Sequence, residues 1–503
     1  MCYYRSTEHI VVFTRKRFIM RKIRHITSVA ASLMLLSAPA PGLAQSQLPT
    51  LGDRISGIYS LEEEYRMGRE FLRSVRRSAP TITDPLLNDY LVNFTHNLAV
   101  HSDLQDYRLA FVIIDSPALN AFAAPGGIIG VNGGLFLNAH TEGEFASVIA
   151  HELAHVSQRH FARSVEDAQR RRIPELATLL ASVVLMGTGS SAGPAAVMAA
   201  QGRSIENQLR FSRQNEAEAD RLGLRTLYSA GYDPDDMASL FERLVAMTRF
   251  SSRPPEFLLS HPVTESRVSD ARSRANQYPE RAAPPDLEYQ LMRARVQVHY
   301  EPNKSNAIKD FSQRLQDNID SNNTDGLRYG LAMAYFEDKQ HDRALELIEQ
   351  LLAKEPNRIT YVASKAEILV DSGDPQTALP FIEHHLRINP ANHPLTMAKA
   401  SALIGIRDYA AAVSVLEAHA QRRPDDHNLW YMIAETQGQA GDISKVHQAR
   451  AEYFILVGDF RSAREQLRYA LRIENDREEN IPLISRLRQR ISDVETLQRE
   501  QQS

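Results

Sequence analysis

The residues with the clearest chemical potential are His151, Glu152 and His155, which form the pattern H-E-x-x-H. If this stretch is helical, the two histidines lie four residues apart on one face, at a spacing that can chelate one metal ion. Imidazole nitrogens suit zinc, which prefers four ligands in a tetrahedron. Glu152 can polarise a water at the metal and pass its proton to a leaving amine. The pattern therefore predicts a zinc hydrolase, in particular a peptidase. The alternative is a surface helix that carries two histidines by chance.

A third metal ligand has to come from elsewhere in the chain, because Gln158 and Phe161 stand where a glycine and a third histidine would extend the motif. Glu216 and Asp220 are four residues apart and share one face of a predicted helix. One carboxylate can bind zinc while the other accepts the spare N–H of a ligand histidine and fixes its tautomer. Glu218 points away on this geometry, and we interpret it as a solvated surface charge.

The stretches H-E-L-A-H and N-E-A-E-A-D resemble the CAAX prenyl-protease-like gluzincin peptidases. The resemblance implies that Glu216 is the third zinc ligand and that Asp220 supports the site from behind. It extends to N-A-F-A-A-P-G-G, which leads into a β-like run at Ile128–Val131. A strand beside a peptidase site can pair with an extended substrate through main-chain hydrogen bonds. An ordinary hairpin in the core is the alternative. The substrate-strand candidates are Asn120, Ala121, Phe122 and Ala123.

His261 and Arg267 lie in a segment that resembles the H-P-x-x-x-x-R motif of that family. In its beta-barrel assembly-enhancing branch, the resemblance implies that this histidine can occupy the fourth zinc position, displace the catalytic water and hold the enzyme off. Arg267 can hold a carboxylate near the site or stabilise a developing oxyanion. The alternatives are a histidine that closes a turn before Pro262 and an arginine on a helix surface.

The first 44 residues are expected to be a secretory signal that starts at Met20. Ala30–Leu36 is apolar but too short to span a bilayer, and Gly42–Ala44 supplies small residues before a cleavage point. An uncleaved anchor is the alternative. The sole cysteine, Cys2, lies in this segment, so the mature chain has no thiol for catalysis.

The net charge of the chain bears on whether it can bind nucleic acid. Without the 7 basic residues and 1 acidic residue of the signal, the mature chain carries 51 basic and 61 acidic side chains. A net charge of −10 without a basic cluster argues against binding to nucleic acid.

Small residues recur with a period of 34 beyond a proline-rich stretch at 278–285. This pattern resembles the tetratricopeptide repeat, whose helix pairs stack into a curved solenoid that binds peptides or partner proteins. A spacer without a ligand is the alternative. Residues 287–300 and 307–315 are expected to form a degenerate first repeat, and capping helices to end the array. The periodic positions are Ala332, Ala366, Ala400 and Ala434, then Ala344, Ala378, Ala412 and Val446, then Pro356, Pro390 and Pro424.

Two apolar stretches, 176–186 and 194–200, lie between the predicted metal-ligand helices. Neither reaches the length of about 20 residues that a membrane span needs. We interpret them as two short helices and a loop over the active site that can touch membrane lipid or nascent barrel strands. A buried core hairpin is the alternative.

The predicted fold is α+β but mostly α: a zincin-type metallopeptidase domain with a small β-sheet at 45–280, and an all-α tetratricopeptide solenoid at 285–495. The resemblance implies a periplasmic zinc endopeptidase with one Zn²⁺ per subunit and a chaperone-like role. Its partners would be unfolded or stalled outer-membrane β-barrel proteins and the β-barrel assembly machinery, with peripheral membrane contact. The competing hypothesis is a non-proteolytic assembly factor that binds clients through its repeats. A zinc scaffold without hydrolysis is disfavoured, because such a site has no use for Glu152.

Overall fold

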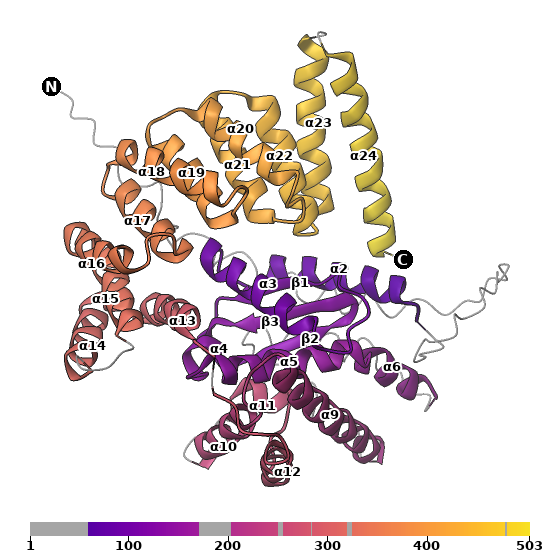
Figure 1. Ribbon diagram of the computed structural model, residues 1–503. Coiled ribbons are helices and arrows are strands. Elements are labelled where there is room, and N and C mark those ends of the chain that lie inside the picture. Colours follow the sequence, from indigo (N-terminus) through magenta and orange to yellow (C-terminus); the bar gives the residue numbers. More distant parts are fainter. Residues whose placement is uncertain are drawn as a thin grey trace, which may run out of the picture.

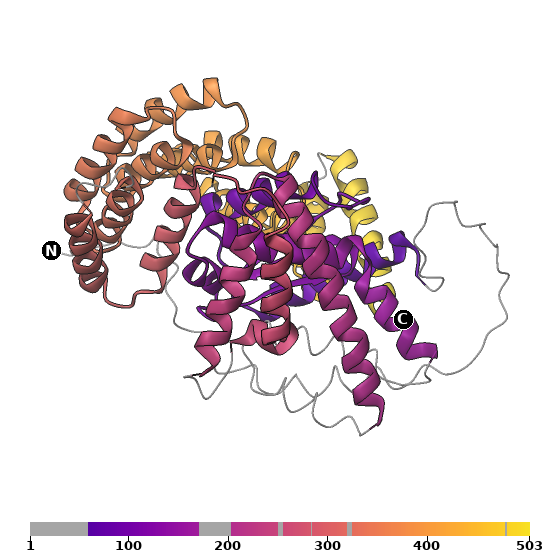
Figure 2. The ribbon, with the colours of Figure 1, turned by 60° about the horizontal axis from the view of Figure 1, so that its bottom comes forward.

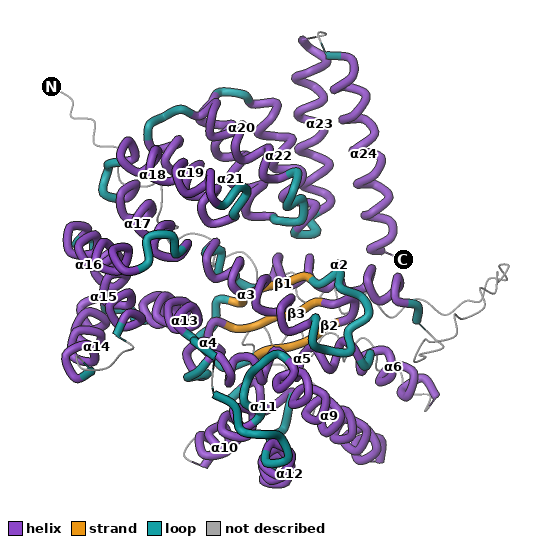
Figure 3. Tube along the Cα trace, in the orientation of Figure 1, coloured by secondary structure: helices purple, strands orange, loops and turns teal. Residues whose placement is uncertain are grey.

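A computed structural model describes residues 59–170, 203–249, 255–282, 284–318, 324–477 and 480–502. The predicted signal at 1–44 and the apolar stretches at 176–186 and 194–200 lie outside these residues. A small sheet lies within a helical N-terminal region, and the later helices form a curved array (Figures 1 and 3). This arrangement confirms the predicted fold class. Within the described ranges, no helix is both long enough and apolar enough to cross a bilayer.

The N-terminal region places its sheet between helices. Strand β3 (Ile128–Asn132) lies in the centre, parallel to β1 (Ala110–Ile114) and antiparallel to β2 (Ala121–Ala124), so β2 is an edge strand. Alternate residues of a strand point to opposite faces. Val112 and Ile128 pack against α2, whereas Ile113 and Ile129 join the core that contains α3 and α5. The elements are α2 (Leu61–Ser78), α3 (Pro85–Ala99), β1 (Ala110–Ile114), β2 (Ala121–Ala124), the 3₁₀ turn η1 (Pro125–Gly127), β3 (Ile128–Asn132), α4 (Gly133–Asn138), α5 (Glu142–Ser157), α6 (His160–Arg170), α9 (Arg203–Ser229), α10 (Asp235–Arg249), α11 (Glu256–Ser260) and α12 (Glu265–Ala275).

Helix α5 runs through the interior of this region. It begins after Thr141, whose Oγ1 accepts a hydrogen bond from the backbone N–H of Glu144 at 3.1 Å. Residues 143–154 are all buried, as expected for a helix whose sequence is largely apolar around its whole circumference. Helix α9 packs along α5. At Gly223 a methyl group would lie only 3.2 Å from the backbone nitrogen of His151, so glycine allows the two helices to approach closely.

The solenoid consists, among the described residues, of six helix pairs. Its small periodic residues lie where paired helices touch: Ala332, Ala366 and Ala400 in the first helices are fully buried. The turn between α17 and α18 uses Gly373 with φ +90°, a conformation that glycine adopts without strain. These observations confirm the predicted repeats. The pairs are α13 (Leu287–Tyr300) with α14 (Lys304–Asp317), α15 (Asp325–Glu337) with α16 (His341–Lys354), α17 (Ile359–Asp371) with α18 (Pro375–Ile388), α19 (His393–Gly405) with α20 (Tyr409–Ala420), α21 (His427–Ala440) with α22 (Ile443–Leu456), and α23 (Phe460–Arg477) with α24 (Ile481–Gln502).

The solenoid curves around the N-terminal region and contacts it near both of its ends (Figures 1 and 2). Near its start, Nη2 of Arg295 in α13 lies 2.6 Å from Oδ2 of Asp84, the residue that caps α3. Near its end, Nε of Arg77 in α2 donates to the carbonyl oxygen of Val457 at 3.2 Å. The helical array is therefore held against the region that contains the sheet.

Candidate metal centre

Three separate parts of the chain bring metal-binding side chains to one point. Helix α5 contributes His151 and His155, α9 contributes Glu216, and His261 follows directly after α11. One ligand atom from each of these four residues lies within 4.8 Å of all the others. The Nε2 atoms of His151 and His155 are 3.0 Å apart, and Nδ1 of His261 lies 3.1 Å from Oε2 of Glu216. The residues predicted from three distant motifs are thus brought together.

The chemistry of this cluster fits a divalent cation. Its three imidazoles and one carboxylate are the ligand types that zinc takes in proteins. Glu152, Glu216 and Asp220 bring three negative charges, and each is at most 5% exposed. Arg267 brings one positive charge at 11% exposure. With the histidines neutral, as metal ligands are, two negative charges remain in a buried environment, where an unbalanced charge is costly. A divalent cation at the point where the ring nitrogens converge would neutralise them.

The proton affinities of the cluster support the same conclusion. Burial opposes protonation of His151, but the carboxylates of Asp220 and Glu216 outweigh it and raise its pKa to about 10. Burial also disfavours the charged form of Glu216, yet the charge of His261 and hydrogen bonds from the histidines hold its pKa well below the ordinary value. The carboxylate therefore stays ionised and attracts a positive charge, which either protons or a metal can supply.

Asp220 and Arg267 hold His151 from the side that faces away from the cluster. Nδ1 of His151 lies 3.0 Å from Oδ1 of Asp220. The guanidinium of Arg267 grips both oxygens of Asp220, at 2.7 and 2.8 Å, and its Nη1 lies 3.1 Å from Oε2 of Glu216. Such a two-pronged contact fixes the carboxylate in orientation as well as position. Arg267 therefore holds carboxylates at the site and does not lie free on a helix surface.

Glu152 and His261 face each other across the cluster. Glu152 is completely buried, and neither of its carboxylate oxygens has a hydrogen-bond partner among the described residues. Its Oε1 lies 3.4 Å from Nε2 of His261. The other ring nitrogen of His261 points to the ligand atoms, and the ring packs on Phe257 with centroids 4.8 Å apart. The imidazole of His261 thus lies between Glu152 and the predicted metal ligands.

His160 is a buried residue beside the cluster that the sequence reasoning missed. Its Nδ1 lies 2.9 Å from Nδ1 of His155, and its Nε2 lies 3.3 Å from Oε2 of Glu218. Glu218 also pairs with Arg163 at 2.9 Å, and its side chain is 27% exposed. The interpretation of Glu218 as a solvated surface charge is therefore wrong. A histidine five residues after the motif was the available signal, but helical spacing alone gave no reason to connect it to His155.

The predicted substrate strand is the edge strand β2 with the residue before it. Ala121 and Phe122 are buried, and the centroid of the Phe122 ring lies 5.9 Å from that of Phe71. The backbone of Asn120 accepts a hydrogen bond from Asn132 at 2.9 Å. Ala123 is only partly buried. Among the described residues, no strand pairs with the second edge of β2. This segment can therefore contact a substrate through the hydrogen-bonding groups of its main chain.

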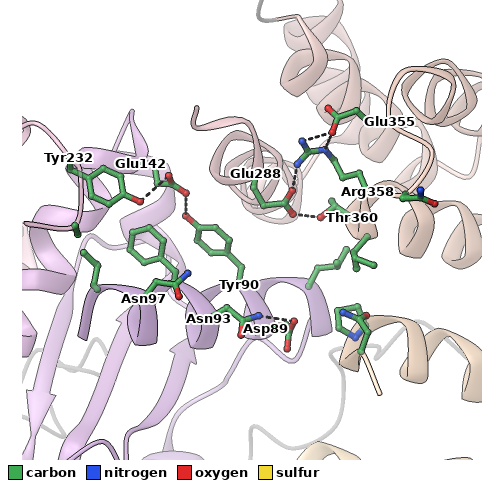
Figure 4. Close-up of a pocket in the computed structure, with 18 of the residues that line it drawn as sticks. Asp89, Tyr90, Asn93, Asn97, Glu142, Tyr232, Glu288, Glu355, Arg358 and Thr360 are labelled. Carbon is green, nitrogen blue, oxygen red and sulfur yellow. Dashed lines mark hydrogen bonds and ion pairs between the residues drawn. The ribbon is translucent and has the colours of Figure 1, made fainter. Parts of the chain in front are cut away.

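A separate cleft of about 870 Å³ lies between α3 and the solenoid (Figure 4). On one wall, the hydroxyls of Tyr90 and Tyr232 donate to Glu142 at 2.8 and 3.1 Å. On the other, Arg358 pairs with Glu288 at 2.6 Å. Glu142 begins α5, whereas the metal cluster lies toward the other end of that helix. The cleft is thus distinct from the cluster and is built by both parts of the chain.

Comparison with known proteins gives the family. The model of Peptidase family M48 matches residues 85–275, which include all the predicted site residues. The chain is 38% identical over 339 residues to the putative beta-barrel assembly-enhancing protease of Vibrio cholerae, covering 67% of this chain and 70% of that protein. The chain belongs to the beta-barrel assembly-enhancing protease family. The Escherichia coli K12 member of the family is 33% identical over 348 residues, covering 69% and 71% of the two chains.

More distant matches agree with a metallopeptidase. The mitochondrial metalloendopeptidase OMA1 of Schizosaccharomyces pombe is 27% identical over 214 residues, covering 42% of this chain and 60% of that protein. This family member is therefore a metallopeptidase. Among solved structures, a tetratricopeptide repeat protein from Parabacteroides merdae covers 49% of this chain and 96% of its own, at 12% identity and a TM-score of 0.28. The evidence for the solenoid is the helix pairing described above.

Proposed function

We propose that this chain is a periplasmic zinc endopeptidase, with a chaperone-like role, that promotes assembly of outer-membrane β-barrel proteins and degrades those that stall. The observation that carries the proposal is the convergence of His151, His155 and Glu216 beside a buried Glu152. The printed names of the relatives, beta-barrel assembly-enhancing proteases, support the substrate class. The β-barrel assembly machinery is the proposed partner for the same reason.

In the proposed mechanism, His151, His155 and Glu216 hold one zinc ion. Zinc supplies Lewis acidity to a peptide carbonyl and lowers the pKa of a water molecule. Glu152 takes the proton of the attacking water and delivers it to the leaving amine. Its oxygens are buried and have no hydrogen-bond partner in the described part of the chain, which keeps them available for that proton. Asp220 and Arg267 keep His151 in the ligand tautomer, and the edge strand β2 lays an extended substrate beside the site.

His261 is proposed as the fourth zinc ligand of a self-restrained state. Its Nδ1 lies 3.3 Å from Nε2 of His151, and its Nε2 lies 3.4 Å from Oε1 of Glu152. An imidazole there occupies the position that a water and a substrate carbonyl need. Because His261 lies in the connection between two helices and not within one, it can leave without unfolding either helix. Displacement by a bound client would then start hydrolysis.

The solenoid is proposed to bind the client or to dock the enzyme on the assembly machinery. Its cleft against α3 offers carboxylates, hydroxyls and aromatic rings, a mixture that suits an extended polypeptide. We also propose a signal at residues 1–44, a peptidase domain at 45–280 and a solenoid domain at 285–495. Export to the periplasm follows from that signal, and membrane contact is peripheral. The acidic mature chain supports a protein partner and no nucleic acid.

Cleavage of an unfolded β-barrel protein by the mature chain tests the proposal. We expect hydrolysis that chelation abolishes and zinc restores, that disappears in Glu152→Gln, and that rises in His261→Ala. The Glu152→Gln variant should still bind one zinc, because Glu152 is not among the proposed ligands. The non-proteolytic alternative is not favoured by the relatives' names. It would gain support if Glu152→Gln still matured barrel proteins as well as the unmodified chain.

A further inference from the structure

His155 is contacted on its far side by a histidine that belongs to neither zinc motif. The Nε2 atom of His155 faces the cluster, 3.0 Å from Nε2 of His151. Its Nδ1 atom lies 2.9 Å from Nδ1 of His160, the first residue of α6. His160 is only 4% exposed. Its other nitrogen lies 3.3 Å from Oε2 of Glu218 on α9, and Arg163 contacts the same oxygen at 2.9 Å.

This contact depends on a turn of the backbone between the two histidines. On a continuous helix, residues five positions apart point about 140° away from each other, too far for two imidazoles to meet. Helix α5 ends before that, and Arg159 takes a left-handed conformation with φ +52°. Such a conformation is uncommon for a residue other than glycine. Arg159 is held by Glu64 at 2.9 and 3.1 Å and by the carbonyl oxygen of Tyr59 at 2.5 Å. The turn redirects His160 toward His155.

The hydrogen atoms in this chain of contacts can be assigned from the outside inward. An ionised Glu218 can only accept, so Nε2 of His160 carries the hydrogen that it shares with that carboxylate. A neutral imidazole has one N–H, which leaves Nδ1 of His160 as an acceptor. Two nitrogens 2.9 Å apart share one hydrogen, and it must come from His155. The N–H of His155 is therefore on Nδ1, and the lone pair of its Nε2 faces the cluster.

We propose that His160 is a positioning residue that fixes His155 as a metal ligand, and that Glu218, held by Arg163, fixes His160 in turn. This inference rests on the proposed zinc site. It gives His155 the kind of support that Asp220 gives His151. In both cases a carboxylate of α9, gripped by an arginine, determines which ring nitrogen is free for the metal. The difference is that an extra imidazole carries the effect from Glu218 to His155.

Zinc affinity is the direct test, because it can be measured without hydrolysis. We would compare the mature chain with His160→Phe, His160→Gln and the control His101→Phe, which changes an exposed histidine of the same region. Zinc affinity is measured by competition with a chromogenic chelator, and the ligand field by the visible spectrum of the cobalt-substituted protein. We expect His160→Phe to bind zinc 10- to 100-fold more weakly and to alter the cobalt spectrum, as loss of an outer partner does.

The order of the two variants separates positioning from packing. Glutamine can accept from His155 and donate to Glu218, so His160→Gln should bind zinc more tightly than His160→Phe. Phenylalanine fills the ring volume, so a packing role predicts the reverse order, which would overturn the proposal. Equal affinities of the mature chain and His160→Phe would also overturn it. If His160→Phe does not fold, Glu218→Ala replaces it, with weaker binding again expected. A mature chain that binds no zinc would overturn the proposed metal site itself.

Discussion

Arg295 is predicted to be the main electrostatic connection between the solenoid and the N-terminal region. Its side chain is 10% exposed, and its Nη2 lies 2.6 Å from Asp84 and 3.1 Å from Glu367. Burial opposes its charge, but the charges of Asp84 and Glu367 and the hydroxyl of Tyr329 together outweigh this and raise its pKa above the ordinary value. Removing one partner of a buried ion pair costs about 3–5 kcal/mol, because the other is left unpaired. Asp84 and Glu367 are 20% and 33% exposed, so water relieves part of this cost. We therefore expect Arg295→Met to lower the free energy of unfolding by about 3 kcal/mol.

Urea unfolding followed by two probes measures this effect. Circular dichroism reports on all helices, and the single tryptophan, Trp430, reports on the solenoid. The matched control is Arg314→Met, which removes a surface pair with Asp310 in which both side chains are at least 37% exposed. That change should cost at most about 1 kcal/mol. If the connection couples the two parts of the chain, the two probes coincide before the change and separate after it. A loss for Arg295→Met no larger than that of the control would refute the reasoning.

Three further changes give distinct outcomes. Asp220→Asn should weaken zinc binding 10- to 100-fold in a chelator competition, because His151 loses the carboxylate that fixes its tautomer. Gly223→Ala should lower both zinc affinity and thermal stability, because its methyl group would press on the backbone at His151. Asp236→Asn should raise the melting temperature at pH 8 and leave it unchanged below pH 4. Burial raises the pKa of Asp236 from the ordinary value of 3.8 to about 6, so the folded state loses stability as the pH rises between these two values and stays destabilised above them.

Features that depend on spacing along one helix could be predicted from the sequence. His151 and His155 share a helix face by periodicity alone, as do Glu216 and Asp220. The solenoid could be predicted because a packed helix pair tolerates only small residues at its closest approach. Ala366 and Ala378 are both fully buried, and each belongs to a series of positions that recurs every 34 residues. In each case the physical requirement acts on residues that are near one another in the chain.

Features that depend on a change of chain direction could not be predicted. His160 reaches His155 only because Arg159 takes a positive φ, and no residue near it signals such a turn. The arginine is held in that conformation by Glu64, which lies 95 residues earlier in the chain. A regular helix through positions 155 and 160 would place their side chains on different faces, so periodicity gives no reason to connect them. The interpretation of Glu218 as a solvated surface charge failed for the same reason. Its contact with His160 depends on the turn at Arg159, which the sequence does not reveal.

Three carboxylates of the candidate site lie on one rigid element, helix α9. Glu216 and Asp220 project within about 40° of each other about its axis, whereas Glu218 projects about 160° away from both. The helix thus supplies the proposed third ligand and the carboxylates proposed to hold both candidate ligand histidines. A shift of α9 by one residue would misplace all three at once. Its register against α5 is set by the close approach at Gly223. The metal centre therefore depends on the packing of two helices as directly as on the residues that would touch the metal.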